Sequence, residues 1–199
     1  MKILYLVEQF NPDSFTDIEV FTYELCLMMQ KNGYNVKIIT CFSSYNTCNN
    51  KRINKNHFVE FIYKGIPILN LDGKEFQIKV LKDLIRKENP DVIHVEYPFR
   101  TIELIKVTKE LGIPYVLNLC DKYLINEHIK AIDHSFKDIF FSAKKVIALN
   151  LSVKKSYEKY FQDLKITILH EEVANKNFLT IEQIAYKYER IYRIKDSKL

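Results

Sequence analysis

The chain has 199 residues, of which 47% are hydrophobic and 28% are charged, and its formal net charge is +5. This length allows one large domain or two small ones, and the composition predicts a soluble, globular protein and excludes a disordered one. Since no window approaches the roughly 18 consecutive apolar residues that a membrane-spanning helix needs, no transmembrane segment is predicted.

The charge and the cysteines exclude further classes of protein. The 30 basic residues are spread along the chain and form no basic block, so nucleic-acid binding is not predicted. The four cysteines lack the paired spacing of a zinc site, and we predict reduced thiols and no metal centre. The apolar run before Glu8 is too short for a signal peptide, so we expect a cytoplasmic protein. Peripheral contact with the inner face of the membrane stays open.

The first forty residues predict one strand–helix–strand unit. The apolar run KILYLV at 2–7 has strand character, 17–32 repeats its apolar residues at helical spacing, and VKIIT at 36–40 is a second strand. Asp17 is expected to cap the helix, and Gly33 to end it. Two strands joined by one helix are typical of a parallel sheet with a right-handed crossover.

The rest of the chain continues the alternation of strands and helices. Strands are expected at 58–63, 66–69, 91–96, 114–119, 144–149 and 165–169, with helices at 74–88, 101–111, 122–142, 152–161 and 180–193. A hairpin is expected at Lys64-Gly65, a long loop at 41–57, and Ser152 as the first capping residue of its helix. The predicted fold is therefore α/β, a Rossmann-like, doubly wound sheet of about six or seven mainly parallel strands with helices on both faces.

Ligands of such sheets bind beyond the carboxyl ends of the strands. The predicted site therefore lies in the loop 8–16 and at the other strand ends. His94 and Glu96 lie two apart on one strand and so share a face, which admits metal or acid–base chemistry, although hydrogen bonding alone is the commoner role for such a histidine. No Walker loop, GxGxxG or GxSxG is present.

Six segments in order resemble the N-terminal, acceptor-side domain of GT-B glycosyltransferases of family 4. They are KILYLVEQFNP, IEVFTYELCLMMQKNGYNVKIIT, KENPDVIHVEYP, KELGIPYVLNLCD, AKKVIALN and KITILHEEV. The resemblance covers about residues 1–173 and implies a single half of a GT-B fold. Residues 174–199 would then form a linker and a C-terminal helix that packs back on this domain, begun by a capping box of Thr180 and Gln183.

The resemblance also reveals departures that imply a degenerate active site. Members of the family usually carry a Gly-Gly pair before the first helix, where Phe15, Thr16 and Asp17 stand here. A histidine near the transferred sugar is replaced by Cys120, which precedes Asp121. The second domain, which holds the nucleotide sugar and a Glu-x7-Glu motif, has no counterpart in this sequence.

Two functions of different classes follow from the resemblance. In the first, the chain is an acceptor-binding domain, incomplete alone, that acts with a partner donor domain on a glycan or glycolipid acceptor. In the second, it is a non-catalytic binding or scaffold protein derived from a glycosyltransferase. No catalytic residue and no cofactor is predicted. The candidate binding residues are Gln9, Phe15, Thr16, Asp17, Glu96, Tyr97, Cys120 and Asp121.

Overall fold

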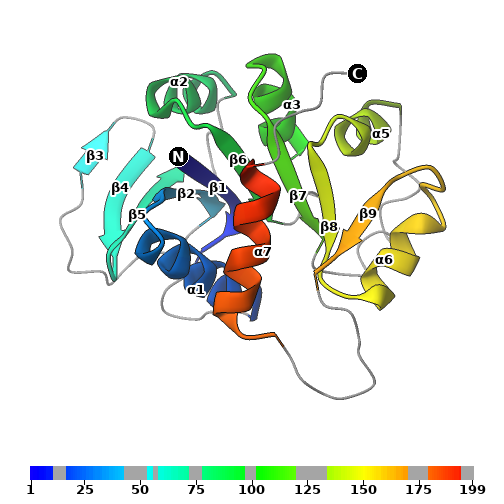
Figure 1. Ribbon diagram of the computed structural model, residues 1–199. Helices are drawn as coiled ribbons and strands as arrows, with labels where there is room; N and C mark the ends of the chain where they lie inside the picture. The colour runs from blue at the N-terminus through cyan, green and yellow to red at the C-terminus, as the bar shows by residue number, and fades with distance from the viewer. Residues whose placement is uncertain are drawn as a thin grey trace.

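In the part of the chain that the structure describes, nine strands form one sheet in the order β3-β4-β5-β2-β1-β6-β7-β8-β9 (Figure 1). The computed structural model describes residues 1–10, 17–42, 53–55, 58–71, 78–96, 102–119, 134–169 and 179–193. The strands are β1 (Lys2–Gln9), β2 (Asn35–Phe42), β3 (Ile53–Lys55), β4 (Phe58–Tyr63), β5 (Ile66–Leu71), β6 (Val92–Glu96), β7 (Tyr115–Leu119), β8 (Lys145–Ala148) and β9 (Ile166–Ile168). The helices are α1 (Asp17–Lys31), α2 (Ile78–Glu88), α3 (Ile102–Glu110), α5 (His134–Phe141), α6 (Leu151–Glu158) and α7 (Ile181–Arg193).

The seven strands from β5 to β9 in the sheet order are parallel, which confirms the predicted doubly wound fold. At one edge, β4 pairs antiparallel with β5 and β3 pairs antiparallel with β4. The expected hairpin is confirmed, since Lys64 and Gly65 both have positive φ, as a tight two-residue hairpin turn requires. The prediction of a loop over 41–57 was wrong at both ends. There β2 continues to Phe42, and β3, a strand too short to show a periodicity, begins at Ile53.

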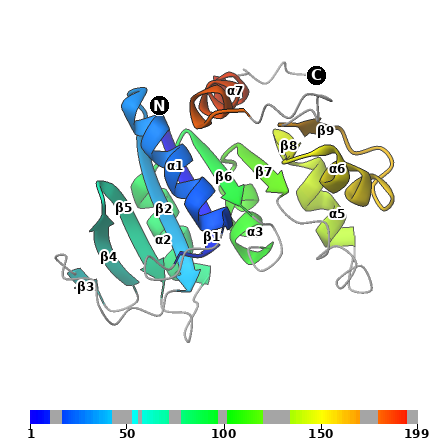
Figure 2. The same cartoon turned by 90° about the horizontal axis from the view of Figure 1, so that it is seen from below.

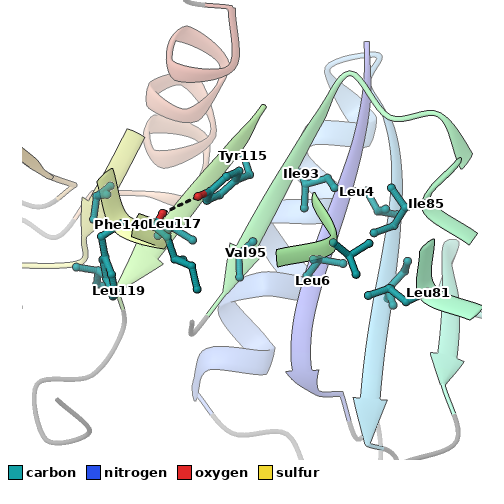
Figure 3. Packing of buried hydrophobic residues seen from close by; sticks show 14 of the residues in the cluster. Leu4, Leu6, Leu81, Ile85, Ile93, Val95, Tyr115, Leu117, Leu119 and Phe140 are labelled. Atoms are coloured by element: carbon teal, nitrogen blue, oxygen red, sulfur yellow. Dashed lines mark hydrogen bonds between the residues drawn. The ribbon is translucent and has the colours of Figure 1, made fainter. Parts of the chain in front are cut away.

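Two apolar layers cover the two faces of the sheet. Alternate residues of β1 point to opposite faces, so Leu4 and Leu6 join one cluster while Tyr5 and Val7 join the other. The first cluster packs under α2, α3, α5 and α6 and is seen from close by in Figure 3. The second packs under α1 and α7, and Figure 2 shows α7 across the sheet from α3 and α5.

Local signals explain where most helices begin and end. Gly33, with φ of +84°, ends α1, and Asn89, with φ of +45°, ends α2 before Pro90. At α7 the capping box is confirmed: Thr180 Oγ1 accepts from the Gln183 amide at 3.4 Å, and Gln183 Oε1 accepts from the Thr180 amide at 3.0 Å. Ser152 was predicted to cap α6, but this prediction was wrong. The cap is Asn150, whose Oδ1 accepts from the Val153 amide at 3.0 Å.

The helix α7 packs back on the sheet. The buried residues of α7 are Ile184, Ala185, Tyr188, Ile191 and Tyr192, at the spacing of one helical face. This face packs against the cluster that β1 and α1 contribute to. Lys187 Nζ also donates to the carbonyl of Leu169, just after β9, at 2.7 Å. No helix in the described ranges is both long and apolar enough to cross a membrane.

Candidate functional site

The strand order places the switch point of the sheet between β1 and β6. From β1 the chain builds the sheet outward through β2 and β5, and it then returns to the other side of β1 to add β6, β7, β8 and β9. Helical connections on opposite sides of such a point leave a crevice beyond the carboxyl ends of its two strands, where ligands of doubly wound sheets bind. Gln9 ends β1 and Glu96 ends β6, so two predicted binding residues lie at this point.

The other predicted site residues are described only in part. Asp17, expected just before α1, is instead its exposed first residue, and Glu19 in the same turn is 3% exposed. Both carboxylates face the positive end of the helix dipole, which stabilises an acidic residue in the first turn as well as at the cap. Five further candidates lie outside the described residues: Phe15, Thr16, Tyr97, Cys120 and Asp121.

A row of buried polar side chains lies beneath the crevice, on the face that α1 and α7 cover. His94, Glu96 and Asn118 are each 0% exposed. Glu96 and Asn118 are register partners on β6 and β7, and Asn118 Nδ2 donates to Glu96 Oε2 at 2.7 Å. His94 Nε2 lies 3.0 Å from Glu96 Oε1, an electrostatic contact whose angles do not meet those of a hydrogen bond.

Tyrosine side chains surround the imidazole of His94. The ring of Tyr5, its register partner on β1, stacks on it with centroids 4.7 Å apart, and the ring of Tyr188 on α7 lies 4.9 Å away. His94 Nδ1 is hydrogen-bonded to the hydroxyl of Tyr192, which is also 3.2 Å from the hydroxyl of Tyr5. The polar cluster of Tyr5, His94, Glu96, Asn118 and Tyr192 therefore joins three strands to α7.

The environment of the polar cluster keeps its tyrosines protonated. Burial raises the pKa of Tyr192 well above its ordinary value, and the nearby Glu96 carboxylate raises it further. Burial likewise raises the pKa of Tyr5, followed by the effect of Tyr192. The Cys26 thiol on α1 is also fully buried, and burial, then Glu96, raises its pKa. This thiol is thus kept in its unreactive form, as the sequence indicated.

The described residues contain no group of three potential metal ligands. His94 Nδ1 is hydrogen-bonded to the Tyr192 hydroxyl, and Glu96 Oε2 accepts from the Asn118 amide. The sequence did not identify Asn118, Tyr5 or Tyr192 as parts of the site. One available signal was a polar residue inside the apolar strand YVLNL, and another was the pair Tyr188 and Tyr192, spaced four apart on one helical face.

A parallel sheet with this strand order, its switch point between β1 and β6 and a final helix returning across it defines one Rossmann-like half of a GT-B protein. The model of Glycosyltransferase Family 4 matches residues 18–171. The chain belongs to this family. A search of curated proteins found no match.

Solved structures of glycosyltransferases share the fold at low sequence identity. The catalytic domain of starch synthase IV from Arabidopsis thaliana, bound to ADP and acarbose, has a TM-score of 0.60 and 11% identity, over 83% of this chain and 50% of that one. The lipopolysaccharide outer core galactosyltransferase WaaB in its apo form has a TM-score of 0.55 and 13% identity, over 87% of this chain and 46% of that one. The chain thus spans about half the length of these two proteins.

A sucrose-phosphate synthase from Thermosynechococcus elongatus matches over a different extent. A structure whose name carries the ranges 27–220 and 406–426 has a TM-score of 0.59 and 13% identity, over 97% of this chain and 98% of that one. A second structure of this enzyme, named without such ranges, is covered over 47% of its length, with a TM-score of 0.52.

Proposed function

We propose that the chain is the acceptor-binding half of a glycosyltransferase and that it acts in glycan or glycoconjugate synthesis with a donor domain from another polypeptide. The observation that carries the proposal is the match of the Glycosyltransferase Family 4 model over residues 18–171. The chain matches half of the larger glycosyltransferases, yet it matches the two-range sucrose-phosphate synthase structure nearly end to end.

The charges at the crevice support binding of an acceptor over binding of a nucleotide sugar. A helix N-terminus next to a strand end ordinarily attracts a phosphate. In this chain the first turn of α1 carries Asp17 and Glu19, and Glu96 ends β6 nearby. These carboxylates repel a diphosphate, and the exposed one, Asp17, can accept hydrogen bonds from the neutral hydroxyl groups of a sugar.

Glycosyl transfer requires both halves of the site. The acceptor hydroxyl oxygen forms a bond to the anomeric carbon of the donor sugar, the bond from that carbon to the nucleotide diphosphate breaks, and the departing diphosphate takes up the hydroxyl proton. The acceptor half can bind and orient the hydroxyl. The donor half must hold the nucleotide and stabilise the charge that develops on the departing diphosphate.

Two titrations of the purified chain test the proposal. Calorimetry with UDP, GDP and ADP sugars should give no saturable heat at submillimolar concentration, and no free nucleotide should be released. Saturation-transfer NMR with a panel of oligosaccharides should detect binding that Asp17→Ala weakens. The matched control is Asp163→Ala, which removes another exposed carboxylate, in the turn before β9.

The results of these titrations distinguish an acceptor-binding domain that needs a separate donor domain from a non-catalytic scaffold. Binding or hydrolysis of a nucleotide sugar by the chain alone would overturn the requirement for a separate donor domain. A chain that binds neither nucleotide sugars nor oligosaccharides would instead be the non-catalytic scaffold, and binding that Asp17→Ala and Asp163→Ala affect equally would locate the acceptor away from the crevice.

A further inference from the structure

We propose that Tyr192 is a positioning residue, through which the returning helix α7 sets the orientation and the protonated nitrogen of His94 and so holds the Glu96 carboxylate in place under the crevice. The proposal rests on the proposed function, because it takes the crevice between β1 and β6 as the acceptor site. Its experiment nevertheless needs no sugar, so the two can fail separately.

The geometry gives the imidazole one preferred orientation. His94 is 0% exposed, and its two ring nitrogens meet different elements: Nδ1 meets the hydroxyl of Tyr192 on α7, and Nε2 lies 3.0 Å from Glu96 Oε1 at the end of β6. The stacked ring of Tyr5 and the tilted ring of Tyr188 restrict the imidazole to one plane. Within that plane, the Tyr192 hydroxyl selects which ring nitrogen faces Glu96.

The same hydroxyl, as a donor to Nδ1, stabilises the tautomer whose proton is on Nε2, beside the Glu96 carboxylate. Tyr192 keeps its proton, since burial raises its pKa, and it can donate that proton to Nδ1 while the hydroxyl of Tyr5 donates to Tyr192. With Nδ1 as the acceptor, the ring proton is on Nε2, the nitrogen that lies 3.0 Å from Glu96 Oε1. The opposite tautomer would turn the lone pair of Nε2 toward a carboxylate oxygen, which is repulsive in a buried site.

The position of Glu96 makes this arrangement relevant to the crevice. A carboxylate that is 0% exposed is stable only if its oxygens are hydrogen-bonded or paired. Asn118 contacts one oxygen at 2.7 Å and His94 the other at 3.0 Å. Loss of the Tyr192 hydroxyl leaves Nδ1 without its donor and frees the ring to exchange tautomers, so the effect should pass through His94 and Glu96 to Asn118.

Nitrogen-15 NMR of the His94 ring and of the Asn118 side-chain amide tests the coupling. In the wild-type chain at neutral pH, Nε2 should resonate as a protonated nitrogen and Nδ1 as an unprotonated acceptor, with His94→Gln and Asn118→Ala assigning the signals. Tyr192→Phe should shift the His94 ring signals. It should also shift the Asn118 amide signal, which it reaches through His94 and Glu96, by more than the line width of that signal. The matched control is Tyr186→Phe, because Tyr186 lies on the same helix but is 62% exposed, and it should shift neither.

Two results would overturn the proposal. One is a wild-type ring with its proton on Nδ1, alone or together with Nε2. The other is a folded Tyr192→Phe variant in which the Asn118 amide keeps its wild-type shift. If Tyr192→Phe does not fold, the wild-type tautomer decides alone. If the ring behaves as expected but no oligosaccharide binds, the proposed function fails while the coupling stands.

Discussion

The hydroxyl oxygens of Tyr5 and Tyr192 lie 3.2 Å apart in the core, although the two residues are 187 positions apart in the sequence. Tyr5 is in the central strand, and Tyr192 is near the end of the described chain. The contact means that α7 completes the interior of the domain. Asn32 at the end of α1 adds a surface link to this helix, because its Nδ2 donates to Glu189 Oε1 at 2.5 Å.

Truncation at Ala174 should destabilise the domain strongly. The deletion exposes core that the buried side chains of α7 cover, and burial of each large apolar side chain contributes roughly 1.5–3 kcal/mol. Several such losses together are comparable to the whole free energy of unfolding of a typical domain, roughly 5–15 kcal/mol. The truncated chain should melt far below the full chain or be insoluble. An unchanged melting temperature would identify α7 as a separate docking element.

Ile184→Ala should lower the free energy of unfolding by about 2–5 kcal/mol, since it removes buried methyl groups and leaves a cavity beneath α7. The matched control on the same helix is Tyr186→Ala, which should change stability by no more than about 0.5 kcal/mol, because that side chain is largely in water. Urea denaturation followed by circular dichroism measures both. Equal losses from the two variants would contradict the orientation of α7.

Asn150→Ala should destabilise the protein by about 0.5–2 kcal/mol, because the amide of Val153 loses its capping acceptor. Asn150→Asp should retain most of the stability, since a carboxylate oxygen replaces the amide oxygen. Ser152→Ala serves as the control, and we expect it to be close to neutral because Ser152 lies inside α6. A larger loss from Ser152→Ala than from Asn150→Ala would show that the helix starts where the sequence alone suggested.

Glu88→Gln should destabilise the protein by about 1–2 kcal/mol at pH 7. The Glu88 carboxylate accepts from Lys2 Nζ and Lys37 Nζ, each at 2.7 Å, at the end of α2. Burial by itself would raise the pKa of Glu88, but the two lysines outweigh it and the pKa is lowered. A carboxyl group with a lowered pKa in the folded state stabilises above its unfolded pKa of about 4.3, and this stabilisation disappears as the pH falls through the folded value.

The difference in the free energy of unfolding between the wild-type chain and Glu88→Gln should therefore have its full value above about pH 5 and should decrease below it. Chemical denaturation at a series of pH values measures this difference. Glu110→Gln is the control, because Glu110 pairs with Lys82 at the surface with 57% of its side chain exposed, and it should cost well under about 1 kcal/mol. A difference for Glu88→Gln that does not vary with pH would mean that the ion pairs do not form in solution.

Asn118→Asp should be destabilising in a way that grows with pH. The introduced carboxyl group would lie beside the Glu96 carboxylate, buried and at hydrogen-bond distance, so its pKa should be raised. A raised pKa means that the folded state holds the proton more tightly than the unfolded state, so stability decreases as the pH rises above about 4. By pH 7 the loss should reach roughly 3–5 kcal/mol.

Asn118→Ala is the control for this substitution. It removes the same hydrogen bond to Glu96 Oε2 but introduces no charge, so the gap in stability between Asn118→Asp and Asn118→Ala should widen with pH. Equilibrium unfolding in urea between pH 4 and pH 8 measures the gap. A constant gap would indicate that Asp at this position turns away from Glu96 toward solvent.

The sequence by itself determined the elements and the fold class. Apolar repeats with a period of two or 3.6 residues depend on which face of a segment is buried, and they identified the parallel strands from KILYLV to KITIL and every described helix. Turn and cap chemistry is also local, so Lys64-Gly65, Gly33 and the Thr180 capping box could be read directly. The local signals were ambiguous at α6, where Ser152 and Asn150 are both good caps, and at β3, which has only three residues.

Only the tertiary structure decided which polar groups meet. His94 and Glu96 are neighbours on one strand, but Asn118 reaches them through the register of β7, and Tyr192 reaches them because α7 returns across the sheet. From the sequence, Tyr5 and Tyr192 can be assigned only to the buried faces of a strand and a helix. Periodicity predicts that a side chain is buried, but it does not predict which group its hydroxyl contacts. The hydrogen bonds of the polar cluster depend on strand order and helix packing, which bring residues distant in the sequence to within about 3 Å of one another.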